Sequence, residues 1–333
     1  MKIRDSAYQY YFYFMQERMT IFWKRYEGLK EGLTKDPILR ENKFTNVYRA
    51  CDRVSQYLIK EVIYNNDDSQ EELDILLRII VFKIFNKIET WQFIKENYGS
   101  VSTKNFNVSA LSKLLAKRIE KDAIFNGAYM MTGSHQKYVD YSSKHEKWLR
   151  MVDKEMIKEG RLNRIINSKS LEEVFNILNE CSFIGDFLAY QYAIDINYSQ
   201  VIDFSENSFV KAGIGAIRGI KKCFSELVTY TYEDCIRYTQ DNLERNREKY
   251  GYESFSSLFG REPQLIDLQN CFCETDKYLR VKVPELQVDN TRIKQKFKGS
   301  KDMEICFFFP PKWNINQNLK ECSAKNLKAL TLF

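Results

Sequence analysis

The sequence has little of what a many-stranded sheet or a metal site requires. Its 333 residues include only 13 Gly and 5 Pro, too few turn-forming residues for a protein built from many short strands. There are two histidines, His135 and His145, and the eight cysteines do not form the close pairs of a zinc site. We therefore expect no metal and no cofactor, and carboxylates as the acid–base groups.

Long apolar runs are also missing. No stretch of the sequence is long and apolar enough to cross a bilayer, and charged residues interrupt the aromatic N-terminal segment at Arg4, Glu17 and Arg18. We expect no membrane partner, and a cytoplasmic (nucleoid-associated) protein, or a nuclear one in a eukaryote. Because no pattern resembles a P-loop, kinase activity is not expected from this chain alone.

Apolar and aromatic residues are abundant and recur at helical spacing. Apolar residues make up 44% and aromatic residues 14%, which predicts a globular chain. The excess of 51 Lys and Arg over 45 Asp and Glu is compatible with a polyanionic partner but does not establish one. The fold class we expect is all-α.

Helix periodicity and capping residues divide the chain. The expected helices cover about 6–28, 37–64 with a break near Thr45, 71–87, 91–97, 109–121, 144–159, 170–181, 186–197 and 233–249. We expect an N-terminal helical part with a base-pocket block at 1–122 and a hairpin and catalytic part at 123–250. The range 251–333 is expected to be a C-terminal extension that packs on the helical body and is irregular beyond about 282.

Two segments resemble the DNA-binding hairpin and the catalytic segment of helix-hairpin-helix DNA glycosylases. The sequence FIGDFLA at 183–189 is similar to the hairpin and first helical turn, and VIDF at 201–204 is similar to the segment with the catalytic Asp. The resemblance implies a glycosylase-like helical fold in which Ile184 and Gly185 bind the DNA backbone and Asp203 is catalytic. It departs from the family at Phe183, where the hairpin usually has its first glycine.

This arrangement suits chemistry on a flipped base. Hairpin amides at the positive end of a helix can hold a phosphate, and flipping the base costs roughly a few kcal/mol. A carboxylate beside the sugar can stabilise the positive charge that develops there. Phe187 lies where bifunctional members have a lysine, so we expect a monofunctional DNA glycosylase that releases a modified pyrimidine and leaves an abasic site.

A second assignment of the glycine turn and of the carboxylate that follows it, here called the alternative register, is also open. AGIGA at 212–216 contains the proper glycine pair, with cations nearby and Glu233 and Asp234 at the matching distance. We favour Asp203 because aliphatic residues immediately precede it. In that reading a second phosphate clamp is formed by Gly213, Gly215, Arg218 and Lys221. The alternative is that these two glycines only separate two helices.

A narrower resemblance covers about residues 10–282. DPIL at 36–39, KFTNVYR at 43–49, DR at 52–53 and SQ at 55–56 resemble the opening block of the α-glutamyl/putrescinyl thymine pyrophosphorylase family. That family includes the helical domain associated with phage 5-hydroxymethyluracil DNA kinases, and antiphage DNA glycosylases. ER at 17–18, GAY at 127–129, GDFLAYQ at 185–191 and QN at 269–270 are also similar. GLT at 32–34 departs from the Pro-Trp-Thr of many relatives.

The resemblance implies a partner, DNA containing modified bases, and a set of base-binding residues: Asn46, Arg49, Asp52, Tyr129 and Gln191. On one helix, Asn46, Arg49 and Arg53 would share a face. The alternative for this block is a buried ion-pair network of Asp52 with Arg53 and Glu17 or Arg18. Two other functions stay open: a transferase acting on activated hydroxymethyluracil, and a non-catalytic DNA-binding protein in which Asp203 caps a helix.

Overall fold

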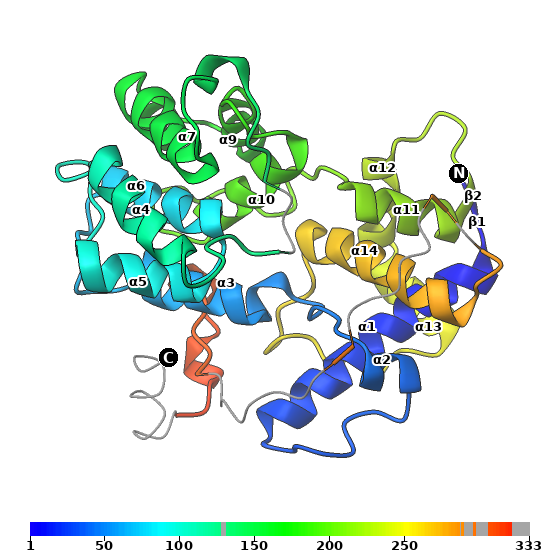
Figure 1. The fold of residues 1–333 in the computed structure, drawn as a ribbon. Coiled ribbons are helices and arrows are strands. Elements are labelled where there is room, and N and C mark those ends of the chain that lie inside the picture. The colour runs from blue at the N-terminus through cyan, green and yellow to red at the C-terminus, as the bar shows by residue number, and fades with distance from the viewer. Residues whose placement is uncertain (128–130, 287, 290–295, 298–305, 322–333) are drawn as a thin grey trace. The chain divides into compact units, whose positions relative to one another are not determined.

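The computed structural model describes residues 1–127, 131–286, 288–289, 296–297 and 306–321. These are mainly helical, which confirms the predicted fold class (Figure 1). The helices are α1 (Asp5–Tyr26), α2 (Pro37–Glu41), α3 (Arg53–Tyr57), α4 (Glu72–Phe85), α5 (Ile88–Tyr98), α6 (Val108–Ile119), α7 (Lys144–Met151), α8 (Arg161–Ile166), α9 (Leu171–Asn179), α10 (Asp186–Asn197), α11 (Ile214–Cys223), α12 (Tyr232–Asp241), α13 (Leu243–Tyr250) and α14 (Leu265–Lys282).

Shorter elements complete the description. The 3-10 helices are η1 (Arg49–Cys51), η3 (Gln136–Tyr138), η5 (Pro311–Trp313) and η6 (Asn316–Asn318), and the π-helical segments are η2 (Leu58–Ile63) and η4 (Val152–Lys158). Strands β1 (Lys2–Ile3) and β2 (Phe224–Glu226) form a small antiparallel sheet with Lys2 opposite Glu226. π-helical segments are uncommon and often occur near functional sites.

The contacts divide the chain into two compact units. Unit 1 contains residues 1–52 and 209–304, and unit 2 contains residues 53–208 and 305–333. The chain therefore leaves unit 1 at residue 52 and returns to it after residue 208. The three-part functional division at 122 and 250 stays a prediction, and α14 shows that the stretch after 250 contains a long helix.

Aromatic side chains of α1 form much of the core of unit 1. Tyr8, Tyr11 and Phe12 are almost completely buried, and the rings of Tyr11 and Phe272 lie 4.3 Å apart. The tyrosine hydroxyl of Tyr8 donates to Thr239 over 2.7 Å, so its burial leaves no polar group without a partner. The aromatic N-terminal segment is therefore a packing surface between α1 and α14.

Helices α11 and α14 approach closely because α11 has glycines on the facing side. A Cβ atom on Gly219 would collide with the backbone carbonyl of Phe272, and one on Gly215 would collide with the thiol of Cys273. Both positions lie one helical turn apart on α11. Their lack of a side chain is thus a requirement of helix packing in unit 1.

The core of unit 2 is built on α4 and α10. Every residue of α10 from Leu188 to Asn197 is buried, as expected of a helix enclosed by protein. A buried ion pair joins the two helices, with the ammonium of Lys83 at 3.1 Å from the carboxylate of Asp195. Such a pair is costly to break from one side, because a buried charge would remain.

Local signals predicted several elements well and one poorly. Helix α10 has the predicted bounds, and Asp36 caps α2 by accepting hydrogen bonds from the amides of Ile38 and Leu39. The expected helical region at 37–64 is instead α2, an irregular stretch, η1, α3 and η2. The expectation that Asn46, Arg49 and Arg53 share a helical face is therefore wrong, because Asn46 is not in a helix.

Over the described parts of the chain, no helix combines the length and apolar character needed to cross a membrane.

Candidate functional site

The segment that resembled a DNA-binding hairpin is a hairpin between α9 and α10. Helix α9 begins at its cap, where the hydroxyl of Ser170 accepts from the amide of Glu173 over 3.1 Å. After α9 the chain turns within residues 180–185, and the amide of Ile184 donates to the carbonyl of Cys181 over 3.1 Å. Helix α10 follows at once, with Gly185 as its N-cap. The two helices thus flank a short turn.

Phe183 has a backbone conformation that glycine adopts more easily than other residues. Its φ is +71°, in the left-handed region that costs a residue with a side chain about 1–2 kcal/mol. The side chain is buried, and its ring lies 5.3 Å from Tyr138 and 5.1 Å from Trp148. Aromatic packing therefore holds the turn in a conformation that its backbone alone disfavours.

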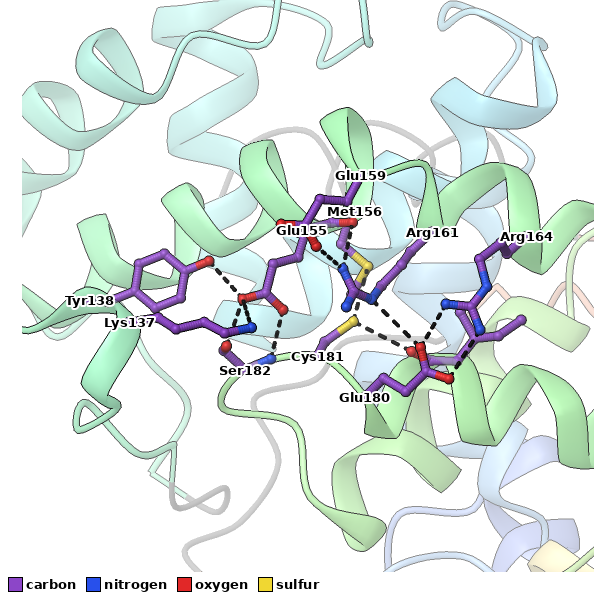
Figure 2. Close-up of polar contacts among 11 residues, drawn as sticks. Lys137, Tyr138, Glu155, Met156, Glu159, Arg161, Arg164, Glu180, Cys181 and Ser182 are labelled. Carbon is purple, nitrogen blue, oxygen red and sulfur yellow. Dashed lines mark hydrogen bonds and ion pairs between the residues drawn. The ribbon is translucent and has the colours of Figure 1, made fainter.

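A buried carboxylate, that of Glu155, accepts hydrogen bonds from the turn of the hairpin (Figure 2). Glu155, in η4, is fully buried, and it accepts hydrogen bonds from the amide of Ser182 over 2.9 Å and from the hydroxyl over 2.6 Å. The hydroxyl of Tyr138 also donates to it over 2.8 Å, and the ammonium of Lys137 lies 3.7 Å away. Three hydrogen-bond donors and one cation thus surround one carboxylate.

The protonation of this group follows from its partners. Burial opposes ionisation of Glu155, but the hydrogen bonds from Ser182 and Tyr138 outweigh burial, so the pKa of Glu155 is lowered. Burial and the bond to Glu155 raise the pKa of the Tyr138 phenol. Glu155 is therefore a structural anion with a neutral tyrosine donor beside it.

Arginines secure the start of the hairpin, next to the Glu155 cluster (Figure 2). Arg164 makes two bonds to the carboxylate of Glu180, 2.6 and 3.0 Å long, and Arg161 pairs with Glu159. Arg161 also donates to the backbone carbonyl of Glu155 over 3.2 Å. The first residue of the turn, Glu180, is thus tied to α8.

Ile184 and Gly185 were both expected to bind the DNA backbone, and the structure gives them different surroundings. The Ile184 side chain is buried, and its amide is used inside the turn. Gly185 has no neighbouring atom within 4 Å of the position that a Cβ would take, so its backbone is open to approach. Next to it, Phe187 is 46% exposed at the start of α10.

Asp203 lies on the loop that follows α10, and its side chain is 79% exposed. The loop is closed by Asn197, whose amide group exchanges hydrogen bonds of 2.9 and 3.0 Å with the backbone of Phe204. The ammonium of Lys312 lies 3.2 Å from the Asp203 carboxylate and donates to the carbonyl of Ile202 over 2.9 Å. Asp203 is thus an exposed carboxylate with one cation beside it.

The second glycine turn lies in unit 1, at the start of α11. The carboxylate of Glu233 accepts from the amide of Ala212 over 2.8 Å, and Asp234 forms a capping box with Thr231. The two carboxylates of the alternative register, Glu233 and Asp234, therefore both accept hydrogen bonds from backbone amides. Gly213 is the N-cap of α11.

The cations near this turn have separate environments. The ammonium of Lys222 is buried and pairs with Asp276 over 3.0 Å. Lys221 is exposed and lies 3.8 Å from Asp289. Arg218 is partly exposed, and its Nε atom is buried. Gly213 is buried and Gly215 packs on α14, so within the expected second clamp Arg218 and Lys221 are the residues that are at least partly exposed.

The N-terminal block forms a polar network in unit 1. Arg18 is buried and donates to the side-chain oxygen of Asn46 over 2.9 Å, and the amide nitrogen of Asn46 donates to Asp52 over 3.1 Å. Arg49 is buried too, and its backbone amide donates to Asp267 over 2.9 Å. The network contains the Arg18 and Asp52 that the alternative interpretation named, with Asn46 between them, but Arg53 is exposed and lies outside it.

One expected base-binding residue, Gln191, lies in unit 2. Gln191 is 5% exposed within α10, one turn before the buried Asp195. Tyr129 lies outside the described residues. In the parts of the chain that the structure describes, no three His, Cys, Asp or Glu side chains are grouped so that they could hold a metal ion.

Sequence reasoning missed Glu155, and only one weak signal marked it. Glu155 lies three positions after Val152 and immediately before Met156, so it falls on the apolar face of its helical segment. A carboxylate on such a face is rarely buried without donors. Its partner, Ser182, lies 27 positions further along the chain.

Comparison with known proteins places this sequence in a family. Residues 5–288 match the family described as 5-hmdU DNA kinase, helical domain. A curated relative, the 5-hmdU DNA kinase of Bacillus phage SP10, is 25% identical over 301 residues, which cover 86% of this chain and 47% of the relative. The chain thus spans about half the length of that relative. No solved structure matches the chain.

These similarities correct the expected chemistry. The relative is named as a kinase, which is a transferase, so the expectation of a monofunctional DNA glycosylase that hydrolyses the N-glycosyl bond is wrong. The physical reason is that a hairpin that grips the DNA backbone is compatible with many reactions on the base. The narrower resemblance is confirmed in its kinase-associated part: the chain belongs to the 5-hmdU DNA kinase helical domain family.

Proposed function

We propose that this chain acts on DNA containing 5-hydroxymethyluracil, as the helical part of a base-modifying transferase of the kinase type. The observation that carries this proposal is the family match over residues 5–288. The sequence contains no P-loop pattern. We therefore propose that this chain binds the DNA and its modified base, and we assign it no binding site for the phosphoryl donor.

The hairpin between α9 and α10 supports a DNA-binding role. Amide groups at the start of a helix, together with the helix dipole, favour a phosphate. The open backbone at Gly185 leaves room for one, and the Glu155 contacts hold the turn in a single conformation. A preformed turn loses little conformational entropy when it binds.

Asp203 is proposed as a polar contact near the bound strand. It follows α10, the helix that the hairpin begins, and its carboxylate is largely exposed beside Lys312. A carboxylate in this position can accept a hydrogen bond from the exocyclic amino group of a neighbouring base. Arg218 and Lys221 are proposed as a second set of backbone contacts, in unit 1.

The first experiment compares two duplexes that differ by one hydroxyl. Binding would be measured by fluorescence anisotropy with DNA containing 5-hydroxymethyluracil and with the same DNA containing thymine. We expect tighter binding of the modified duplex, and affinity that falls steeply as salt rises. Equal, weak binding of both would overturn the proposal.

Product analysis then separates a transferase from a binding protein. DNA incubated with the protein and a nucleoside triphosphate would be digested and its nucleosides weighed by mass spectrometry. For this chain alone the expected result is preferential binding with no altered nucleoside, because no binding site for the phosphoryl donor is assigned to it. A 5-hydroxymethyldeoxyuridine of higher mass would instead show that the chain also binds the phosphoryl donor and is a complete transferase.

A variant of the hairpin tests its contact with DNA. Gly185→Ala places a methyl group in open space, so the fold should tolerate it at a cost of about 1 kcal/mol or less. A phosphate held close to that backbone would be displaced, so the affinity for DNA should fall about tenfold. The matched control is Ser170→Ala, which removes the cap at the far end of α9 and should leave DNA affinity unchanged.

A further inference from the structure

Asp52 is held through one of its two carboxylate oxygens. Its Oδ1 atom accepts from the backbone amide of Asn46 over 2.9 Å and from the side-chain amide over 3.1 Å. Within the described residues no hydrogen bond or ion pair uses Oδ2, and Asp52 as a residue is not completely buried. One oxygen is thus fixed in place, and the other is left for a ligand.

The group that holds Asp52 is itself fixed. The Asn46 side-chain oxygen accepts from the guanidinium of Arg18 over 2.9 Å, so its NH2 group must point to the other side. There it donates to the carbonyl of Cys51 over 3.0 Å as well as to Asp52. Arg18 is held in turn by the carbonyl of Thr45, 3.0 Å from its Nε atom. The Asp52 carboxylate is preorganised by this chain of contacts.

The charges around Asp52 come from three elements of unit 1. Arg18 of α1 and Arg49 of η1 favour its ionised form, and Glu274 of α14 disfavours it. Burial is the largest effect and, against the Asn46 amide bond, raises the pKa of Asp52 to about 6. The carboxylate is therefore mostly ionised at neutral pH and is neutralised by mild acid.

5-Hydroxymethyluracil differs from thymine by one hydroxyl group. A carboxylate oxygen is a strong acceptor for such a hydroxyl. A site built to bind a hydroxyl rejects the analogue that lacks it, because a polar group of the site would lose its partner. The open oxygen of Asp52 has the chemistry for this discrimination.

We infer that Asp52 determines specificity: its Oδ2 atom accepts the hydrogen bond of the 5-hydroxymethyl group of a flipped base, and the Asn46–Arg18 pair holds Asp52 in position. This inference rests on the proposed function, since it assumes that the chain binds the modified base.

The test measures a ratio of affinities. For each variant, the Kd for the thymine duplex is divided by the Kd for the 5-hydroxymethyluracil duplex in the same preparation. A loss of folded protein changes both values equally and cancels. Wild type should give a ratio of about ten or more, as expected for one charge-assisted hydrogen bond. Asp52→Ala should lower it to about one, with thymine binding unchanged.

The control variant is Asp5→Asn, an exposed acid at the start of α1, 13 residues and thus roughly 20 Å along the helix from Arg18. It should keep the wild-type ratio. A ratio near one in wild type would overturn the proposed function itself. A wild-type ratio of ten that persists in Asp52→Ala would overturn only the role of Asp52.

A pH series adds a readout that a structural role would not change. The wild-type ratio should fall several-fold between pH 7.5 and pH 5, because protonation of Asp52 removes the charged acceptor. Asp267 also has a pKa of about 6, raised by burial, but it faces the Arg49 amide and should affect both duplexes equally. In Asp52→Asn the ratio should be smaller and independent of pH; a slope equal to that of wild type would contradict the inference.

Discussion

Glu155 accepts hydrogen bonds from both the backbone amide and the hydroxyl of Ser182, at 2.9 and 2.6 Å. In the sequence, Glu155 precedes α8 and α9 and Ser182 follows them. Their contact fixes the turn of the hairpin. The left-handed backbone conformation of Phe183 is unfavourable by itself. Contacts from outside the turn, such as this one, are therefore needed to stabilise it. The geometry of the proposed DNA contact at Gly185 thus depends on a carboxylate that is fully buried.

Replacing Glu155 by Gln should destabilise unit 2. A neutral amide offers one acceptor where Ser182 and Tyr138 present three donors, so buried donors would lose their partners, at about 2–3 kcal/mol. Urea unfolding measures this loss. The control is Glu159→Gln, whose side chain is 42% exposed, and which should cost less than about 1 kcal/mol. Equal losses for both variants would refute the special role of Glu155.

The contribution of Glu155 should also depend on pH. Its pKa is lower in the folded protein than in the unfolded chain, so folding favours the ionised form. The stabilisation is therefore complete above the ordinary pKa of a glutamate and is lost as pH falls through the lowered value. The difference in unfolding free energy between wild type and Glu155→Gln should shrink in that acidic range. A constant difference from pH 7 to pH 3 would contradict this assignment.

Phe183 allows the backbone and the side chain to be tested separately. Phe183→Ala removes the packing on Tyr138 and Trp148 and keeps a side chain at φ +71°, at a cost of about 3–5 kcal/mol. Phe183→Gly loses the same packing but relieves the left-handed strain. The glycine variant should therefore be about 1 kcal/mol more stable than the alanine variant in thermal unfolding. The opposite order would show that this turn is not strained.

Gly219 should be intolerant of any side chain. In Gly219→Ala the new methyl group would overlap the backbone carbonyl of Phe272, so α11 and α14 would have to separate, at about 3 kcal/mol or more. Calorimetric unfolding would detect the loss. Gly185→Ala is the comparison, because its methyl group meets no neighbour. A similar small loss in both would show that the two helices can adjust.

Lys312 should stabilise the loop that carries Asp203. In Lys312→Met the carbonyls of Ser199 and Ile202 lose their donor, so hydrogen exchange at residues 199–204 should increase, with a loss of about 1–2 kcal/mol. Asp203→Asn changes only an exposed partner and should cost less than about 0.5 kcal/mol. An unchanged exchange rate in Lys312→Met would exclude this bracing role.

The sequence by itself determined those helices whose signals are local, and it missed others such as α11 and α14. Asp36 before Pro37 predicts the start of α2, and Gly185 and the apolar run after it predict α10, since caps and helical periodicity act over about four residues. It also contained the family resemblance that the comparison confirmed for the kinase helical domain. The reaction did not follow from the hairpin, because a backbone-binding turn does not specify chemistry.

Only the tertiary structure decided which polar groups meet. Glu155 and Ser182 are 27 positions apart, and Arg18 and Asn46 are 28 apart, so no helical or strand period relates them. Burial brings them together, and burial also makes their hydrogen bonds obligatory, because a buried polar group without a partner is costly. The same long-range packing holds Phe183 in a conformation that local preference would give to glycine.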